Sequence, residues 1–166
     1  MHFKSGDIIV HPTYGIGKVA GIEEMQYQGS QIHPYYKIEI ENGVIWVQVD
    51  DAGEARLRPL TPASELKIYR EILTSPPTPL SEDRYKRFSE YNARLKNPTF
   101  KVWCEVVRDL TAHGFIKRLN EYDSSTLRKV TDILAKEWAL SAGIPIAEAI
   151  KEIKSTLQEA QQARSQ

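Results

Sequence analysis

The side chains that could carry out chemistry do not form a catalytic set in this sequence. Cys104 is the only cysteine, and it lies between Trp103 and Glu105 in an apolar helical stripe. That setting predicts a buried, unreactive thiol rather than a nucleophile. The four histidines share no metal-ligand spacing. The sequence therefore predicts a protein that is not an enzyme and that holds no metal or cofactor.

A glycine-rich segment, residues 15–21, resembles a phosphate-binding loop only superficially. Its third glycine, Gly21, comes one position too late for the G-x-G-x-x-G pattern, and Val19 follows Lys18 where a Walker motif has serine or threonine. The segment also lies between predicted strands, with no helix N-terminus to hold an anion. We therefore expect a structural turn here.

The densest group of basic residues could bind nucleic acid. It comprises Arg84, Tyr85, Lys86 and Arg87, with Lys101 further along the chain. Arginine and an aromatic ring at the start of a helix suit contacts with DNA phosphates or with the minor groove. The same residues could instead form a solvated helix face that pairs with the acidic residues at positions 82, 83 and 90. The sequence leaves both interpretations open.

Trp46 is a candidate anchor for a protein partner. It lies between Ile45 and Val47 in a predicted strand, so its side chain is on the opposite face from theirs. If Trp46 faces outward beside Gln48, it can act as a binding hot spot, and the strand edge can accept a strand from a partner. If Trp46 faces inward, it belongs to the core and Val47 is outside. Both orientations are open at this point.

The elements that must position these residues differ between the two halves of the chain. Residues 1–61 alternate between short apolar runs and turns, among them Asn42-Gly43, a strong hairpin signal. Five short strands in so few residues predict a small, strongly bent β-barrel of the SH3 or Tudor type.

Residues 62–160 have the apolar spacing of helices, so the predicted fold is α+β with two domains, the barrel and an all-α domain. Helices are expected to begin at Thr61, Ser81, Thr99, Ser124 or Ser125, and Pro145, and one to end at Gly143. A short, separate helical piece is expected over residues 113–120. The proline-rich stretch at 74–79 predicts a linker-like break, and the polar residues at 161–166 predict a frayed tail.

Composition and charge limit the class of protein. Of the 166 residues, 41% are hydrophobic and 27% are charged, which is typical of a folded globular protein. No apolar stretch is long enough to span a membrane, and no apolar leader is found, so we expect an intracellular protein. The formal net charge is zero, but residues 1–60 carry five basic and eight acidic residues. This uneven charge fits two surfaces with different partners, but ordinary scatter of charge along the chain explains it equally well, so both interpretations stay open.

Two sets of residues resemble a known family. The opening, Phe3-Lys4-x-Gly6-Asp7-x-x-Val10-x-Pro12-x-x-Gly15-x-Gly17, is similar to that of the CarD/CdnL family of bacterial transcription regulators. It is also similar to the RNA polymerase-binding domain of the transcription-repair coupling factor. Further on, Glu105-Val106-Val107-Arg108-Asp109-Leu110 and Ile133-Leu134-Ala135-x-Glu137-x-Ala139-Leu140 resemble the family's helical domain. The resemblance covers about residues 1–142, and without a helicase motor the chain resembles the stand-alone regulator.

The resemblance implies a function for each domain. The barrel would dock on the β subunit of RNA polymerase by strand pairing, through Met25, Tyr27, Trp46 and Gln48. Met25 and Gln48 hold positions where the family typically has arginines, so a more apolar contact is expected. The helical domain would contact promoter DNA at the upstream edge of the melted bubble. Arg84, followed by Tyr85, corresponds to the family's wedge tryptophan, and Lys129 corresponds to a basic DNA-contacting position.

These implications predict a regulator that modulates open-complex stability and binds DNA weakly, by virtue of being tethered to the polymerase. We expect a monomer in the cytoplasm that is associated with the nucleoid through RNA polymerase. The alternative is a protein-interaction adaptor that uses the barrel and does not contact DNA.

Overall fold

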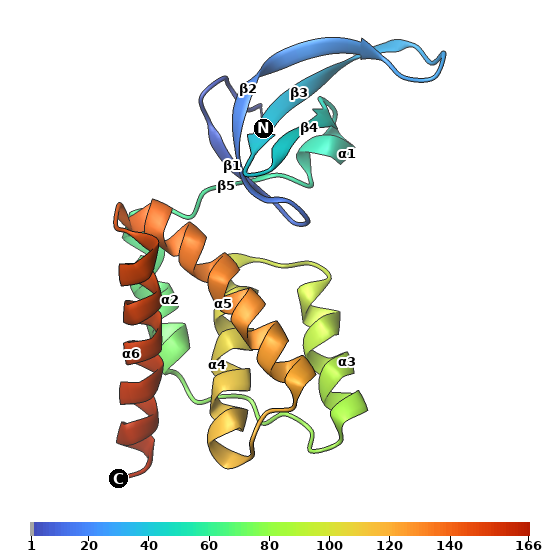
Figure 1. Cartoon of the computed structure of the whole chain (residues 1–166). Helices are drawn as coiled ribbons and strands as arrows, with labels where there is room; N and C mark the ends of the chain where they lie inside the picture. Colours follow the sequence, from blue (N-terminus) through green and yellow to red (C-terminus); the bar gives the residue numbers. More distant parts are fainter. Residues whose placement is uncertain (1) are drawn as a thin grey trace. The chain divides into compact units, whose positions relative to one another are not determined.

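The computed structural model describes residues 2–166, and the chain divides into two compact units, Met1–Leu60 and Thr61–Gln166. The first unit is a sheet and the second is helical (Figure 1). The predicted α+β class, with a small β unit followed by an all-α unit, is therefore confirmed.

The first unit is built on a five-stranded antiparallel sheet with the strand order β4-β3-β2-β1-β5. The elements are β1 (Ile8–His11), β2 (Gly15–Gln26), β3 (Ile32–Ile40), β4 (Gly43–Gln48), the short helix α1 (Asp51–Glu54) and β5 (Arg58–Pro59). Strands β2 and β3 extend past β4 as a two-stranded arm, which Figure 1 shows projecting from the sheet. The core lies on one face, around Ile9, Tyr36, Ile38 and Val47.

Local geometry explains where these strands turn and approach one another. The two turn residues of the β3–β4 hairpin are Glu41 and Asn42, one position earlier than the predicted pair, since Ile40 pairs with Gly43. At the tip of the β2–β3 arm, Gln28 and Gly29 have φ values of 48° and 77° and form the predicted turn. Gly17 allows a close strand approach, because a Cβ atom there would lie 2.5 Å from Ile38 Cγ2.

The second unit packs its helices around one apolar core. The elements are the 3₁₀ turn η1 (Ala63–Glu65) and the helices α2 (Leu66–Thr74), α3 (Arg84–Leu95), α4 (Phe100–Ile116), α5 (Glu121–Ala142) and α6 (Ile146–Arg164). Trp103, Cys104 and Trp138 are buried in this core, as the apolar stripes predicted. The Pro-rich stretch before α3 is neither helix nor strand, so it breaks the helical pattern where the sequence indicated.

Helix ends confirm some predictions and correct others. Thr99 caps α4 by accepting a hydrogen bond from Val102 N, and Gly143 ends α5 with a φ of 70°. The cap of α3 is Asp83 rather than Ser81, and the cap of α5 is Asn120 rather than Ser124 or Ser125. In each of these two helices, the side chain of the residue directly before the first turn accepts from N–H groups of that turn. Helix α3 therefore begins later than predicted, and α5 begins earlier.

Three further predictions about the helical unit are wrong. Thr61 caps no helix, because its Oγ1 donates to Glu137 Oε1 at 2.9 Å. Residues 113–116 continue α4 instead of forming a separate helical piece. Helix α6 continues to Arg164, so most of the predicted frayed tail is helical, and Leu157 still anchors that end in the core. Across residues 2–166, no helix combines the length and the apolar character that crossing a membrane requires.

Candidate binding surfaces

The side chain of Trp46 points away from the core of the sheet unit. Trp46 is 44% exposed, whereas its neighbour Val47 is 8% exposed and packs among the core residues. Trp46 Nε1 donates to Glu23 Oε2 at 3.4 Å, and Lys37 Nζ donates to Glu23 Oε1 at 3.1 Å. The hydrogen bonds from Lys37 and then Trp46 hold the pKa of Glu23 below its ordinary value. The structure thus selects the outward orientation, with the indole held by a carboxylate.

Three of the four predicted docking residues lie on one face of the sheet. Trp46 is opposite Lys37, Gln48 is opposite Tyr35, and Tyr35 is opposite Glu23. Met25 lies two residues from Glu23 and therefore shares its face, because side chains alternate along a strand. We call Glu23, Met25, Tyr35, Lys37, Trp46 and Gln48 the outer face.

Tyr27, the fourth predicted docking residue, lies just beyond the end of β2 and is 65% exposed. It belongs to the tip of the β2–β3 arm rather than to the strands of the outer face. Sequence reasoning missed Tyr35 and Glu23, although the period-two alternation of β3 and β2 could have assigned both to this face.

Strand β4 is at one edge of the sheet, so half of its backbone groups face away from β3. Ile40 and Gly43 close the two-residue hairpin, and Val49 N donates to Pro34 O at 2.9 Å. In an antiparallel pair, every second residue bonds to the neighbouring strand. The peptide groups of Val44 and Trp46 therefore face the open edge. At the end of β4, α1 follows closely and Gln48 O accepts from Asp50 N.

Arg87 is not part of an exposed basic cluster, which corrects the sequence prediction. Arg87 is only 6% exposed, and its Nε and Nη2 both lie 2.8 Å from Asp123 Oδ2. Its Nη1 donates to the carbonyls of Ser81 and Glu82 at 2.9 and 3.0 Å. Each of its three guanidinium nitrogens thus has a partner inside the protein, so Arg87 holds the start of α3 on α5 and is not available to DNA phosphates while these contacts last.

The other three residues of the predicted cluster are exposed at the start of α3. The Arg84 guanidinium lies 4.7 Å from the centroid of the Tyr85 ring and donates to the Tyr85 hydroxyl at 2.8 Å. Tyr85 is 69% exposed, and Lys86 is exposed beside it. This arrangement presents an aromatic ring backed by a cation, a combination that suits contact with a base or a phosphate.

Lys101 and Lys129 are not adjacent to this group. Lys101 is at the beginning of α4, which lies at the opposite end of the unit from the start of α3 (Figure 1). Its Nζ lies 3.7 Å from Glu105 Oε1. Lys129 is exposed on α5, eight residues after that helix begins. That separation corresponds to about 12 Å along the helix axis.

A second aromatic group, which sequence reasoning missed, lies at the same end of the unit as Tyr85. The beginning of α3, the end of α4 and the beginning of α5 meet there (Figure 1). The rings of Phe88 and Tyr122 pack with centroids 4.8 Å apart, and both remain more than one-third exposed. Lys117 and Arg118 follow the end of α4 and are exposed. We call Arg84, Tyr85, Lys86, Phe88, Lys117, Arg118 and Tyr122 the aromatic–basic end.

Comparison with family models covers nearly the whole chain. Residues 3–61 match the CarD-like/TRCF RID domain, and residues 69–154 match the CarD C-terminal domain. The chain belongs to the CarD family. CarD-type proteins are transcription regulators that interact with RNA polymerase, and they are not known as enzymes, which fits the prediction of a non-enzyme. No curated protein sequence matches the chain.

The E-V-V-R-D-L motif of this CarD C-terminal domain has a structural role in positioning α3. Asp109 accepts hydrogen bonds from Thr78 N and from Arg94 Nη1, both at 3.0 Å. Arg108 donates to Ser75 Oγ at 2.7 Å and to Asp109 at 2.8 Å. The motif therefore ties both the segment before α3 and α3 itself to α4, which fixes where the aromatic–basic end lies.

The one thiol of the chain, Cys104, is buried and therefore poorly reactive. Burial is the main cause that raises the pKa of the Cys104 thiol, so the thiolate is disfavoured. Among residues 2–166, no group of three or more His, Cys, Asp or Glu side chains is arranged to hold a metal ion. The chemistry on its surface consists of hydrogen bonds, aromatic contacts and charge.

Proposed function

We propose that the sheet unit docks on the β subunit of RNA polymerase through the open edge of β4 and the outer face around Trp46. The observation that carries this proposal is the exposed indole beside unpaired peptide groups of an edge strand, in a domain that matches the RID model. A strand added to β4 gains main-chain hydrogen bonds at Val44 and Trp46, and its side chains gain contacts on the outer face.

Trp46 would supply most of the side-chain affinity of this contact. A tryptophan offers a large apolar surface with little conformational freedom to lose, and such residues dominate binding energies at interfaces. The Glu23–Lys37 pair holds the indole in place before binding, since Glu23 accepts from both side chains. Because Met25 and Gln48 are uncharged, the outer face would rely on apolar contact more than on charge.

We propose further that the aromatic–basic end contacts promoter DNA at the upstream edge of the melted bubble. Arg84, Lys86, Lys117 and Arg118 would contact phosphates, and the exposed rings of Tyr85, Phe88 and Tyr122 would stack on unpaired bases. Lys129 would reach phosphates only if the DNA runs along α5. Lys101 is at the start of α4, at the far end of that helix from the aromatic–basic end, so it would not share this contact.

Tethering makes a weak DNA contact sufficient. The chain carries 22 basic and 22 acidic residues, so free DNA binding is expected to be weak. Docking of one monomer on the polymerase raises the local concentration of the helical unit at the promoter. A contact worth about 1.4 kcal/mol in the open complex alone would shift the open-to-closed ratio tenfold. This role places the protein in the cytoplasm, on the nucleoid.

The test compares two variants of the full chain on a growth-linked promoter such as that of ribosomal RNA. Trp46→Ala should lose both polymerase binding and the effect on open-complex lifetime. Tyr85→Ala should keep polymerase binding but lose most of the lifetime effect. Ile68→Ala, which changes an exposed apolar residue on α2, is the matched control and should behave as wild type. An unchanged lifetime effect in Tyr85→Ala would remove Tyr85 from the DNA contact.

The second candidate is an adaptor that docks through the same sheet unit without touching DNA. The burial of Arg87 favours it, because one of the two arginines of the predicted cluster serves the fold instead. The two functions differ in their salt dependence. Crosslinking of the helical unit to promoter DNA in the polymerase complex, weakening as salt rises, supports DNA contact, and its complete absence supports the adaptor.

A further inference from the structure

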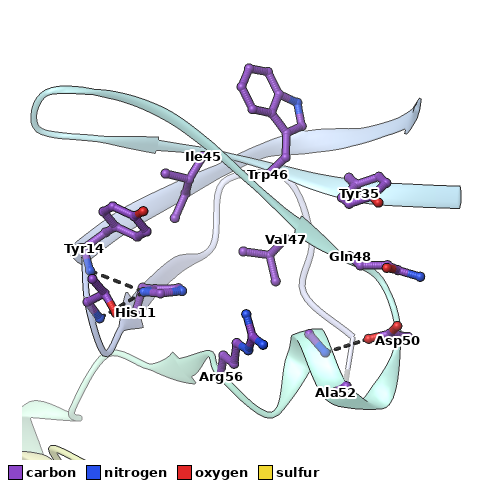
Figure 2. A pocket seen from close by; sticks show the side chains of 12 residues that line it. His11, Tyr14, Tyr35, Ile45, Trp46, Val47, Gln48, Asp50, Ala52 and Arg56 are labelled. Carbon is purple, nitrogen blue, oxygen red and sulfur yellow. Dashed lines mark hydrogen bonds between the residues drawn. The ribbon is translucent and has the colours of Figure 1, made fainter. Parts of the chain in front are cut away.

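A pocket lies beside the open edge of β4, on the face opposite to Trp46 (Figure 2). On β4 the lining runs from Ile45 to Gln48. The side chains of Ile45 and Val47 point into the pocket, whereas the indole of Trp46 points away. His11 and Arg56 extend into the same space from β1 and from the segment after α1. The pocket is therefore the inner-face neighbour of the edge to which a partner strand would be added.

His11 offers a hydrogen-bond donor in this pocket. Its Nδ1 accepts from Thr13 N at 3.0 Å and from Tyr14 N at 3.3 Å, so Nδ1 carries no proton. Burial, and then the charge of Arg56, lower the pKa of His11, which keeps the ring neutral at pH 7. The proton of the neutral ring is then on Nε2. Within residues 2–166, Nε2 makes no hydrogen bond.

Arg56 contributes a guanidinium group that no carboxylate of the pocket contacts directly. In the part of the chain that the structure describes, Arg56 forms no ion pair. The one carboxylate in the lining, Asp50, accepts from Gly53 N at 2.6 Å and caps α1. On the other face of the sheet, the cation of Lys37 is already paired with Glu23. The pocket thus combines apolar walls with two donors, the Arg56 guanidinium and His11 Nε2, which suit an anionic side chain.

We propose that this pocket receives an aspartate or glutamate side chain from the partner strand that pairs with β4, with Arg56 and His11 Nε2 as its donors. The inference rests on the docking proposed above and specifies the chemistry of the partner. Directly opposed residues of paired strands have their side chains on the same face. Partner residues opposite Ile45 and Val47 therefore face the pocket, and the residue opposite Trp46 faces the indole. The acidic residue belongs opposite Val47, because Arg56 extends toward Val47 (Figure 2).

The experiment measures binding of the full chain to RNA polymerase core enzyme, comparing wild type with Arg56→Glu, Arg56→Lys and Lys4→Glu. Arg56→Glu should weaken binding about tenfold or more, since it places two carboxylates in one pocket. Arg56→Lys should retain most of the affinity. Lys4→Glu makes the same charge change at an exposed residue outside the pocket and should bind as wild type. Thermal melts of each variant show that the fold is kept.

A charge exchange then identifies the partner residue. Each aspartate and glutamate on the docking lobe of the β subunit is replaced by lysine, and each variant polymerase is tested with Arg56→Glu. Restoration of binding by one such change supports the proposal. If Arg56→Glu binds as wild type while Trp46→Ala is weakened, or if no acidic residue of the lobe restores binding, the pocket does not receive an acidic side chain although docking stands. If wild type itself does not bind the polymerase, the docking proposal fails and this inference fails with it.

Discussion

Replacing Arg87 with alanine should destabilise the helical unit strongly, whereas replacing Arg84 should not. The two arginines lie three positions apart on α3, but Arg87 is buried against Asp123 and Arg84 is exposed beside Tyr85. In Arg87→Ala, Asp123 Oδ1 still accepts the hydrogen bond from the Tyr91 hydroxyl at 2.7 Å, but the carboxylate loses its ion pair with the arginine. The carbonyls of Ser81 and Glu82 also lose their donor.

The size of the effect follows from this burial. Removing one member of a buried ion pair costs about 3–5 kcal/mol, because the other charge stays buried and uncompensated. For a domain of about this size, each kcal/mol lowers the melting temperature by about 4 °C, so Arg87→Ala should melt roughly 12–20 °C below wild type. An exposed arginine without a buried partner contributes about 0–1 kcal/mol, so Arg84→Ala should melt within a few degrees of wild type.

The assay is thermal and urea denaturation of the full chain, followed by circular dichroism at 222 nm, where the helices dominate the signal. The double variant Arg87→Met/Asp123→Leu separates charge from packing. If the cost comes from an uncompensated charge, the double variant should be more stable than Arg87→Ala by about 2 kcal/mol or more. Equal melting temperatures for Arg87→Ala and Arg84→Ala would show that Arg87 does not hold α3, and would return it to the candidate DNA contacts.

Three further outcomes test other parts of the structure. Gly17→Ala should destabilise the sheet unit by about 1–3 kcal/mol in urea denaturation, since its Cβ would lie 2.5 Å from Ile38 Cγ2, and wild-type stability would refute that close packing. Cys104 should react with a thiol reagent only as the helical unit unfolds, and rapid labelling of the native protein would contradict its burial. Burial lowers the pKa of His113 in the folded protein, so below about pH 6.5 the unfolded chain binds a proton there more readily than the folded one, and the free energy of unfolding should fall. His113→Gln should lose less stability over the same pH range. An equal loss would show that His113 is not the source of the pH dependence.

The sequence predicted the fold well where local pattern decides it. The switch from alternating strands to helical stripes near residue 61, the break at 74–79 and the burial of Trp103 and Trp138 all depend on the periodicity of neighbouring residues. Helix caps were less certain, because several polar residues precede α3 and α5 and any of them can accept the first N–H bonds. Asp83 and Asn120 are selected by the exact helix start, which packing of the whole unit determines.

The candidate surfaces depend on contacts between residues far apart in sequence, and local pattern does not contain them. Alternation showed that Trp46 and Val47 are on opposite faces, but the inward face is decided by packing of Val47 with β3 and β1. The charge of Arg87 suggested a surface role until its pairing with Asp123, 36 residues away, placed it inside. The Phe88–Tyr122 ring contact likewise joins two helices that no short motif connects.

Docking through the outer face is best tested by the affinity of the full chain for RNA polymerase core enzyme, measured side by side for wild type, Trp46→Ala and Tyr85→Ala. Wild type should bind, and Trp46→Ala should bind about 30-fold more weakly or worse, as expected for a tryptophan hot spot worth about 2 kcal/mol or more. Tyr85→Ala, which also removes an exposed ring, should bind as wild type. Equal binding by Trp46→Ala and wild type would contradict docking through the outer face and the edge of β4.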